Sequence, residues 1–308
     1  MGRYVARRML QMIPVVIGTT FIIYALVWAL PGDPFAGRCG ARPCPAAYVA
    51  EMTDKYNLDD PLPIAYVKYL GNLIRGDFGE TFQGLSVAEE LVRAYPTTLK
   101  LALVAIVFEI LIGIGAGIMA GLRRGSFIDN LVLVSTLVVV SIPVFVIGSV
   151  LQLFLGMRWG IFPATVGGDA SLYNLILPGF VLASLSLAYV ARLTRTSLAE
   201  NRRADYVRTA VAKGLPQRRV IGIHTMRNSL IPVITFIGAD FGALLGGAIV
   251  TEGIFNVPGV GNLIFRSITS RDGVMVTGAV TVLVLVFLLV NLLVDLIYGW
   301  LDPRISHG

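Results

Sequence analysis

The sequence is poor in charged residues, cysteine and histidine, and each scarcity excludes a class of protein. Only 14% of its 308 residues are Asp, Glu, Lys or Arg, whereas soluble domains contain about 25%. Two cysteines exclude a disulfide-rich scaffold, and His224 and His307 are too far apart for an HExxH zinc helix. None of the four lysines precedes Ser or Thr, so the chain has no Walker A phosphate loop. We therefore expect no cofactor in this chain, and an ATP-driven process would need another chain to bind the nucleotide.

Apolar residues make up 56% of the chain, and the mean hydropathy is +0.77. A membrane-spanning helix needs about 20 mainly apolar residues. Six stretches qualify: Met9 to Leu30, Leu99 to Gly121, Leu131 to Leu155, Leu175 to Ala191, Ser229 to Val250 and Val274 to Leu301. The sequence therefore predicts an all-α membrane protein with six transmembrane helices, and the net charge of +6 does not indicate a nucleic-acid partner.

The distribution of positive charge predicts the orientation in the membrane. Arg3, Arg7 and Arg8 precede the first span as in a signal peptide, but its apolar run is too long, which predicts a retained signal anchor. The N-terminus, residues 122–130, residues 192–228 and the tail hold 15 Lys and Arg, against 3 in the short opposite loops. By the positive-inside rule, both termini are cytoplasmic.

The spans suggest three parts. Residues 1–94 comprise the first helix and an extracytoplasmic segment, residues 95–301 form a transmembrane domain of five helices, and residues 302–308 are a cytoplasmic tail. Helical spacing from Tyr66 to Leu73 favours a small folded segment outside the membrane over a disordered loop. No internal repeat supports an inverted-repeat secondary transporter.

The cytoplasmic loop 192–228 carries nine Lys and Arg and only two acids. It lies between two spans, so it meets water, headgroups or a partner. Asp205 is expected to cap a helix through Lys213, and Gly214 and Pro216 are expected to end it.

On that helix, Ala210, Lys213 and Gly214 follow i, i+3, i+4 spacing, which places two small residues on one face beside Arg208. Another surface can approach such a face closely. The alternative is a basic loop resting on anionic lipid, to which each Lys or Arg contributes about 1 kcal/mol. Physical reasoning from these residues leaves both interpretations open.

The loop also resembles that of a known family. The segments are Asp205-Tyr-Val-Arg-Thr-Ala-Val-Ala-Lys-Gly-Leu-Pro216 and His224-Thr-Met-Arg-Asn-Ser-Leu-Ile-Pro232. They resemble the EAA-type loop of binding-protein-dependent ABC importer permeases, in the dipeptide/oligopeptide and nickel branch. Further similarities are Leu30-Pro-Gly-Asp-Pro34, Gly76-Asp-Phe-Gly79, Pro96-Thr-Thr-Leu99 and Glu252-Gly-Ile-Phe-Asn-Val-Pro-Gly-Val-Gly261. Where many family loops have Glu-Ala-Ala, this chain has Arg208-Thr209-Ala210, so a Glu contact to an ATPase is not carried over.

The resemblance implies a type I importer permease in the bacterial cytoplasmic membrane. Its partners would be a homologous second permease, two ATPases that hold ATP and Mg, and an extracytoplasmic peptide-binding protein. The chain itself would be non-catalytic and would form half of the path for peptide. The residues that would couple to the ATPases are Asp205, Arg208, Thr209, Ala210, Lys213, Gly214 and Leu215.

Acidic residues inside spans are further candidates, because a charge at the bilayer centre costs about 2.5–3.5 kcal/mol. Glu109 and Asp240 are expected to face the translocation path, with the interface to a second permease as the alternative for Asp240 and structural pairing as the alternative for Glu109 and Asp295. A second candidate site is an outer gate or binding-protein contact, with a rigid connector as the alternative. Its residues are Glu252, Phe255, Pro258 and Gly259.

Three other functions remain open from the sequence. A nickel or metal-chelate permease is the alternative within the family. An ion-coupled secondary transporter would use Asp240, and an intramembrane protease would need a pair such as Asp240 and Asp295. Neither acid lies in a recognised protease motif.

Cys39 and Cys44 are expected to form a disulfide, because both lie in a loop assigned to the oxidising side of the membrane. Mass spectrometry of the unreduced, alkylated protein should show the mass of a closed loop with neither thiol modified. Ready alkylation of both cysteines would contradict the bridge.

Overall fold

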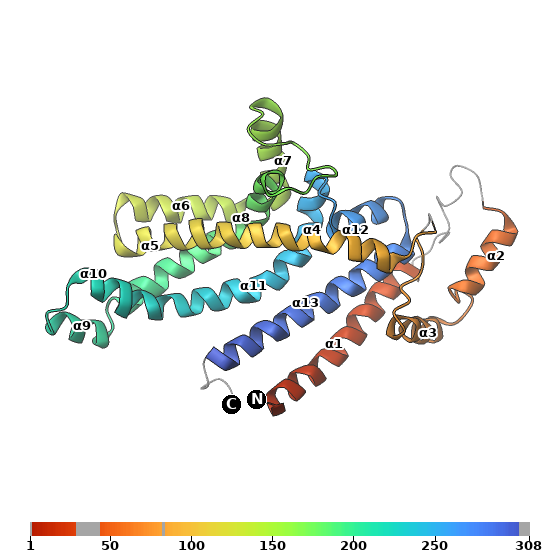
Figure 1. Ribbon diagram of the computed structural model, residues 1–308, viewed down its shortest axis with the longest axis horizontal. Coiled ribbons are helices and arrows are strands. Elements are labelled where there is room, and N and C mark those ends of the chain that lie inside the picture. The colour runs from red at the N-terminus through yellow and green to blue at the C-terminus, as the bar shows by residue number, and fades with distance from the viewer. Residues whose placement is uncertain (1, 29–43, 82–83, 302–308) are drawn as a thin grey trace. The chain divides into compact units, whose positions relative to one another are not determined.

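The computed structural model describes residues 2–28, 44–81 and 84–301, and these form helices (Figure 1). Within these ranges the only extended pairing is an isolated bridge between Glu80 and Ser86. The predicted all-α fold is therefore confirmed. Contacts divide the chain into two compact units, Met1–Thr98 with Pro258–Gly308, and Leu99–Val257. Cys39, the Leu30–Pro34 motif and the tail 302–308 lie outside the described residues.

Within the described residues, five helices are long and apolar enough to cross a membrane, and two broken pairs bring the number to as many as seven. The five are Ala6–Trp28, Val87–Leu122, Leu172–Asn201, Gln217–Gly246 and Gly273–Val294. The third expected span, Leu131 to Leu155, is not one straight helix. It consists of α6 (Phe127–Ser141), α7 (Val144–Leu151) and η2 (Gln152–Arg158), with a bend of 101°. Pro143 explains the break, because the residue before a proline avoids helical angles and Ile142 is extended at φ −104° and ψ 127°.

The first unit is built on two antiparallel helices, α1 (Gly2–Trp28) and α13 (Gly273–Leu301). Gly273, at the start of α13, lies against Val27 near the end of α1, whereas Arg8 and Asn291 line one hollow at the other end. The start of α1 and the end of α13 therefore lie at the same end of this pair (Figure 1). The cytoplasmic placement of that end stays a prediction. α12 (Val260–Thr269) packs on α13. Because α13 also packs on α1, it belongs to one unit with the N-terminal residues rather than with the second to fifth spans.

Two helices follow α1 in this unit, α2 (Ala46–Lys55) and α3 (Leu62–Ile74), which confirms the helix expected from Tyr66 to Leu73. Tyr66 anchors α3 to α1. Its ring packs against Tyr24, and its hydroxyl donates to the Ile17 carbonyl at 2.8 Å and lies 2.8 Å from the Thr20 hydroxyl. This segment is therefore folded onto the first membrane helix.

The second unit surrounds α8 (Leu172–Asn201), which packs against α5, η1, α6, α7 and α11 (Figure 1). One continuous helical stretch combines α4 (Val87–Phe108), η1 (Glu109–Ile114) and α5 (Gly115–Leu122). Its Gly113, Gly117 and Gly121 recur every four residues and face α8. A Cβ at Gly117 would lie 2.5 Å from the Thr194 Cβ and 2.6 Å from the Ala191 carbonyl oxygen. This close contact is the small-xxx-small packing of membrane helices.

We expect Gly117→Ala to destabilise this unit by about 1–3 kcal/mol, because the added methyl group overlaps backbone as well as side-chain atoms of α8. Gly115→Ala is the matched control, since its Cβ would meet no atom within 4 Å. Thermal unfolding of the two variants in detergent measures the difference. Equal melting temperatures would contradict the proposed close contact.

Candidate functional site

The loop predicted to be cytoplasmic is shorter than expected, because helices extend into it from both sides. α8 continues to Asn201 rather than ending near Ala191, and α10 (Gln217–Arg219) with η3 (Val220–Thr225) leads into α11 (Met226–Phe255). The extension of α8 is explained by packing, since Thr194, Ser197 and Leu198 are buried. The non-helical connections are confined to the flanks of α9 (Asp205–Ala212), where the chain turns back toward the membrane helices (Figure 1).

The loop has a small hydrophobic core of its own. Val207 and Ala210 of α9 pack with Val220 of η3, and Leu215 covers them. Ala210 is only 5% exposed. The prediction that Ala210 and Gly214 form an exposed face is therefore wrong for Ala210. Its small side chain packs against Val220 of η3 inside the loop.

Both ends of α9 can be compared with the expectation. Asp205 does not cap the helix, since Ala204 holds that position and Asp205 is the first helical residue, with a side chain 96% exposed. The expected end is confirmed. Gly214 has φ +73°, its N–H donates to the Val211 carbonyl at 2.9 Å, and the Leu215 N–H donates to the Ala210 carbonyl at 3.3 Å. This pair of bonds is a Schellman motif, which ties the end of α9 to the loop core.

The outward surface of α9 combines basic and apolar groups. Arg208, Thr209 and Lys213 are exposed, as the sequence suggested. Sequence reasoning missed the two apolar members of this surface, Tyr206, which is 39% exposed, and Val211, which is 48% exposed. We call these five residues the α9 face. The α9 face therefore presents two apolar groups beside basic side chains, which makes it a candidate contact surface.

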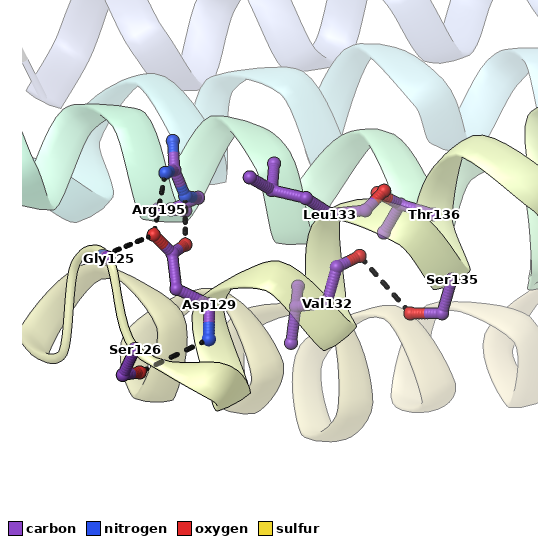
Figure 2. Close-up of polar contacts among 8 residues, drawn as sticks. All are labelled: Gly125, Ser126, Asp129, Val132, Leu133, Ser135, Thr136 and Arg195. Atoms are coloured by element: carbon purple, nitrogen blue, oxygen red, sulfur yellow. Dashed lines mark hydrogen bonds and ion pairs between the residues drawn. The ribbon is translucent and has the colours of Figure 1, made fainter.

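A buried ion pair lies at the base of the loop, and sequence reasoning missed it as well (Figure 2). Asp129, in the first turn of α6, is 2% exposed at its side chain and binds Arg195 of α8. Arg195 Nη2 donates to Asp129 Oδ2 at 2.8 Å, and Nε donates to Oδ1. Gly125 N–H donates to the same Oδ2 at 2.8 Å, and the Ser126 side chain caps α6 by accepting from the Asp129 N–H. The short α5–α6 turn is thereby bound to α8.

The two acids predicted for the translocation path come together in the second unit. Glu109 begins η1 and is fully buried, and Asp240 of α11 interacts with it electrostatically. Ser186 of α8 lies next to Asp240. No Lys, Arg or His in the described part of the chain pairs with either carboxyl group. The polar group that the structure places next to Glu109 is thus Asp240 of a neighbouring helix, and both the structural pairing and the path-facing role of Glu109 stay predictions. The side chain of Asp295 lies outside the description.

The irregular turn predicted for residues 252–261 is narrower than expected, because it occupies only residues 256–259, between α11 and α12 (Val260–Thr269). Glu252 and Phe255 belong to α11 and are fully buried, and Asn256 ends that helix with φ 49°. The Phe255 carbonyl accepts from Val166 N–H at 2.8 Å. In this conformation the Glu252 and Phe255 side chains cannot touch a soluble partner, and Pro258 is the exposed member of the set, beside buried Gly259.

The Gln152 amide fixes the nearby loop. It donates to the carbonyls of Ala164 and Ile254, each at 2.8 Å, so it ties residues after η2 to the end of α11. Among the described residues, no three His, Cys, Asp or Glu side chains gather where they could hold a metal ion.

Comparison with known proteins gives consistent results along the whole chain. Residues 113–307 match the model of the binding-protein-dependent transport system inner membrane component, and residues 1–102 match the model of its N-terminal part. The chain is 36% identical to a di/tripeptide transport system permease protein of Pseudomonas aeruginosa, covering 99% of this chain and 98% of the relative. It is 35% identical to a dipeptide transport system permease protein of Escherichia coli K12, covering 100% and 99%. It is 34% identical to an oligopeptide transport system permease protein of Bacillus subtilis, covering 100% of both.

These matches also account for the multi-pass helical architecture and for the loop that resembles an EAA-type segment. The family model alone covers more than half of the residues, and the relatives align from end to end. The chain therefore belongs to the family of binding-protein-dependent transport system inner membrane components, the permease subunits of ABC importers, and is a multi-pass protein of the bacterial inner membrane.

Proposed function

We propose that this chain is the permease subunit of an ATP-driven importer of di- and oligopeptides. It forms half of the translocation path, pairs with a homologous second permease, and receives peptide from an extracytoplasmic binding protein. The full-length similarity to three peptide permeases carries this proposal. Their names favour peptide over nickel, and membership of a binding-protein-dependent family disfavours the ion-coupled transporter and the intramembrane protease.

The α9 face is the proposed docking surface for an ATPase. A free two-turn helix is unstable in water, but here the Val207–Ala210–Val220 core and the Schellman motif hold α9 in shape without a partner. A preformed helix loses less conformational entropy on binding. Val211 and Tyr206 supply apolar contact area, and Arg208 and Lys213 supply positive charge.

The position of α9 suggests how ATP binding reaches the membrane. α9 follows α8 after three residues, and it packs against Val220, the first residue of η3, which leads into α11. A displacement of α9 by closing ATPases would therefore move the ends of two membrane helices together. ATP and Mg would remain on the ATPases, and the present chain would contribute movement rather than chemistry.

The α9 face is tested best by a substitution that leaves the loop core intact. Val211→Asp places a charge on an exposed side chain, where the permease itself should lose little stability, but it should prevent docking. Gly214→Val should have the same outcome for a different reason, because a β-branched residue at φ +73° opposes the Schellman motif by about 1–2 kcal/mol. We expect both variants to be inserted in the membrane and to lose their ATPases on co-purification.

Arg203→Ala is the control for these two variants. Its side chain is exposed, lies outside α9, and makes no ion pair within the described ranges. It should retain the ATPases and transport peptide normally. Normal ATPase retention and peptide uptake by Val211→Asp would contradict the docking assignment.

For Asp240 we propose contact with the translocation path, where it would meet the ammonium group of a passing peptide. It is half-buried next to Glu109 and has no cationic partner among the residues described, so its charge is not used within this chain. Specificity would rest mainly on the binding protein, so tight binding here is not required.

Asp240→Asn should therefore assemble normally and slow peptide uptake severalfold, whereas Glu89→Gln, at an exposed carboxyl group in the first turn of α4, should have no effect. Uptake into proteoliposomes at saturating binding protein measures the rate. An unaltered rate for Asp240→Asn with normal assembly would leave this residue a structural role only.

A further inference from the structure

The last turns of α8 are fastened to the α5–α6 turn at two levels. At the first level, buried Asp129 and half-buried Arg195 form the pair that binds α8 to the start of α6 (Figure 2). About two helical turns further along α8, Arg202 Nη1 donates to the carbonyl of Leu122, the last residue of α5, at 2.8 Å. Arg202 is also the residue that ends α8, directly before the chain enters α9. The α5–α6 turn is thus attached to the same helix end that carries the α9 face.

We propose that the Asp129–Arg195 pair is a mechanical clamp that makes the α5–α6 hairpin move with the ATPase-docking loop. Asp129 and Arg195 are accordingly positioning residues for transport. The inference rests on the proposed docking role of α9, and it adds a second membrane element to those that the loop moves. Without the clamp, the loop would drive α8 and α11 while the hairpin followed only through its packing.

The geometry of the pair suits this role better than apolar packing does. Along the hairpin, Gly117 and Gly121 bring the backbones close to Thr194 and Leu198, which fixes the distance between the helices. Smooth contacts of this kind resist separation, but they leave sliding along the helix axis possible, and packed helices do shift by a turn in switching proteins. A carboxylate that accepts from two nitrogens of one guanidinium has a single register.

Because the pair is largely buried, its role in coupling can be distinguished by experiment from a role in the stability of the fold. Asp129 is 2% exposed and Arg195 is 17% exposed at the side chain. Replacing both members of a buried ion pair by apolar residues of similar size is often neutral or stabilising, whereas removing one member leaves a buried charge unpaired. A pair that served only to stabilise the fold would therefore be replaceable by Leu and Met. A clamp could not be replaced in this way, because an apolar pair does not fix the position of α6 along the axis of α8.

The test is made on the complete importer in proteoliposomes, with the second permease, both ATPases and the binding protein. Peptide uptake and ATP hydrolysis are measured on the same vesicles, and their ratio is the readout. The variants are Asp129→Leu with Arg195→Met, Asp129→Asn alone and Arg195→Gln alone. Arg203→Ala, one residue beyond Arg202 and exposed, is the matched control.

We expect the apolar pair to be inserted and to retain its ATPases, yet to transport about tenfold less peptide per ATP, as for a lost coupling between sites. The single variants should show the same fall in ratio wherever they fold, and Arg203→Ala should keep the wild-type ratio. A wild-type ratio in the apolar pair would overturn the clamp and leave a packing role.

The outcome for the unaltered importer separates the two levels of inference. If wild-type protein fails to retain the ATPases or to take up peptide, the proposed function is wrong, and the clamp is overturned with it. If wild-type protein transports peptide and all clamp variants keep its ratio, the proposed function survives and only the clamp is overturned.

Discussion

The closeness of α5 to α8 is the constraint on which the second unit depends. At Gly117 no side chain fits, since a Cβ would lie 2.5 Å from a Thr194 atom. In a bilayer, helices gain little from burying apolar surface against one another, so close packing and polar contacts have to hold them together. The glycine contact provides the packing, and the Asp129–Arg195 pair provides the polar contact. Together they make α8 the centre of the unit and determine what lies next to the loop that contains α9.

The loop that contains α9 shows how a short helix can be preformed at the end of two membrane helices. Its stability comes from side chains that look unremarkable in the sequence, Val207, Ala210 and Val220, and from the left-handed Gly214. The exposed residues of α9 take no part in this core, and they combine apolar and basic groups. Buried and exposed positions are interspersed within the eight residues of α9, so the helix packs on its own loop and still has an exposed surface.

The acids inside the membrane helices illustrate a different use of polar groups. Glu109 and Asp240 come from helices distant in the sequence and are brought together beside Ser186 of α8. Neither is paired with a cation in the part of the chain that the structure describes. Burial of such groups is costly, which is why they mark functional positions more often than structural ones.

Composition and hydropathy by themselves determined the all-α membrane class and most spans, because about 20 apolar residues in a bilayer have few alternatives to a helix. The end of α9 at Gly214 could also be predicted from the sequence, because it depends on the φ preference of one residue. The break at Pro143 also has a local cause, and a proline inside an apolar span predicts a kink, but hydropathy does not sense backbone direction and gives no sign of the 101° angle. Only the tertiary structure decided that Ala210 faces inward, that Val211 faces outward, and that Asp129 meets Arg195. These outcomes depend on which helices become neighbours, and contacts between residues 66 positions apart leave no periodic signal in the sequence.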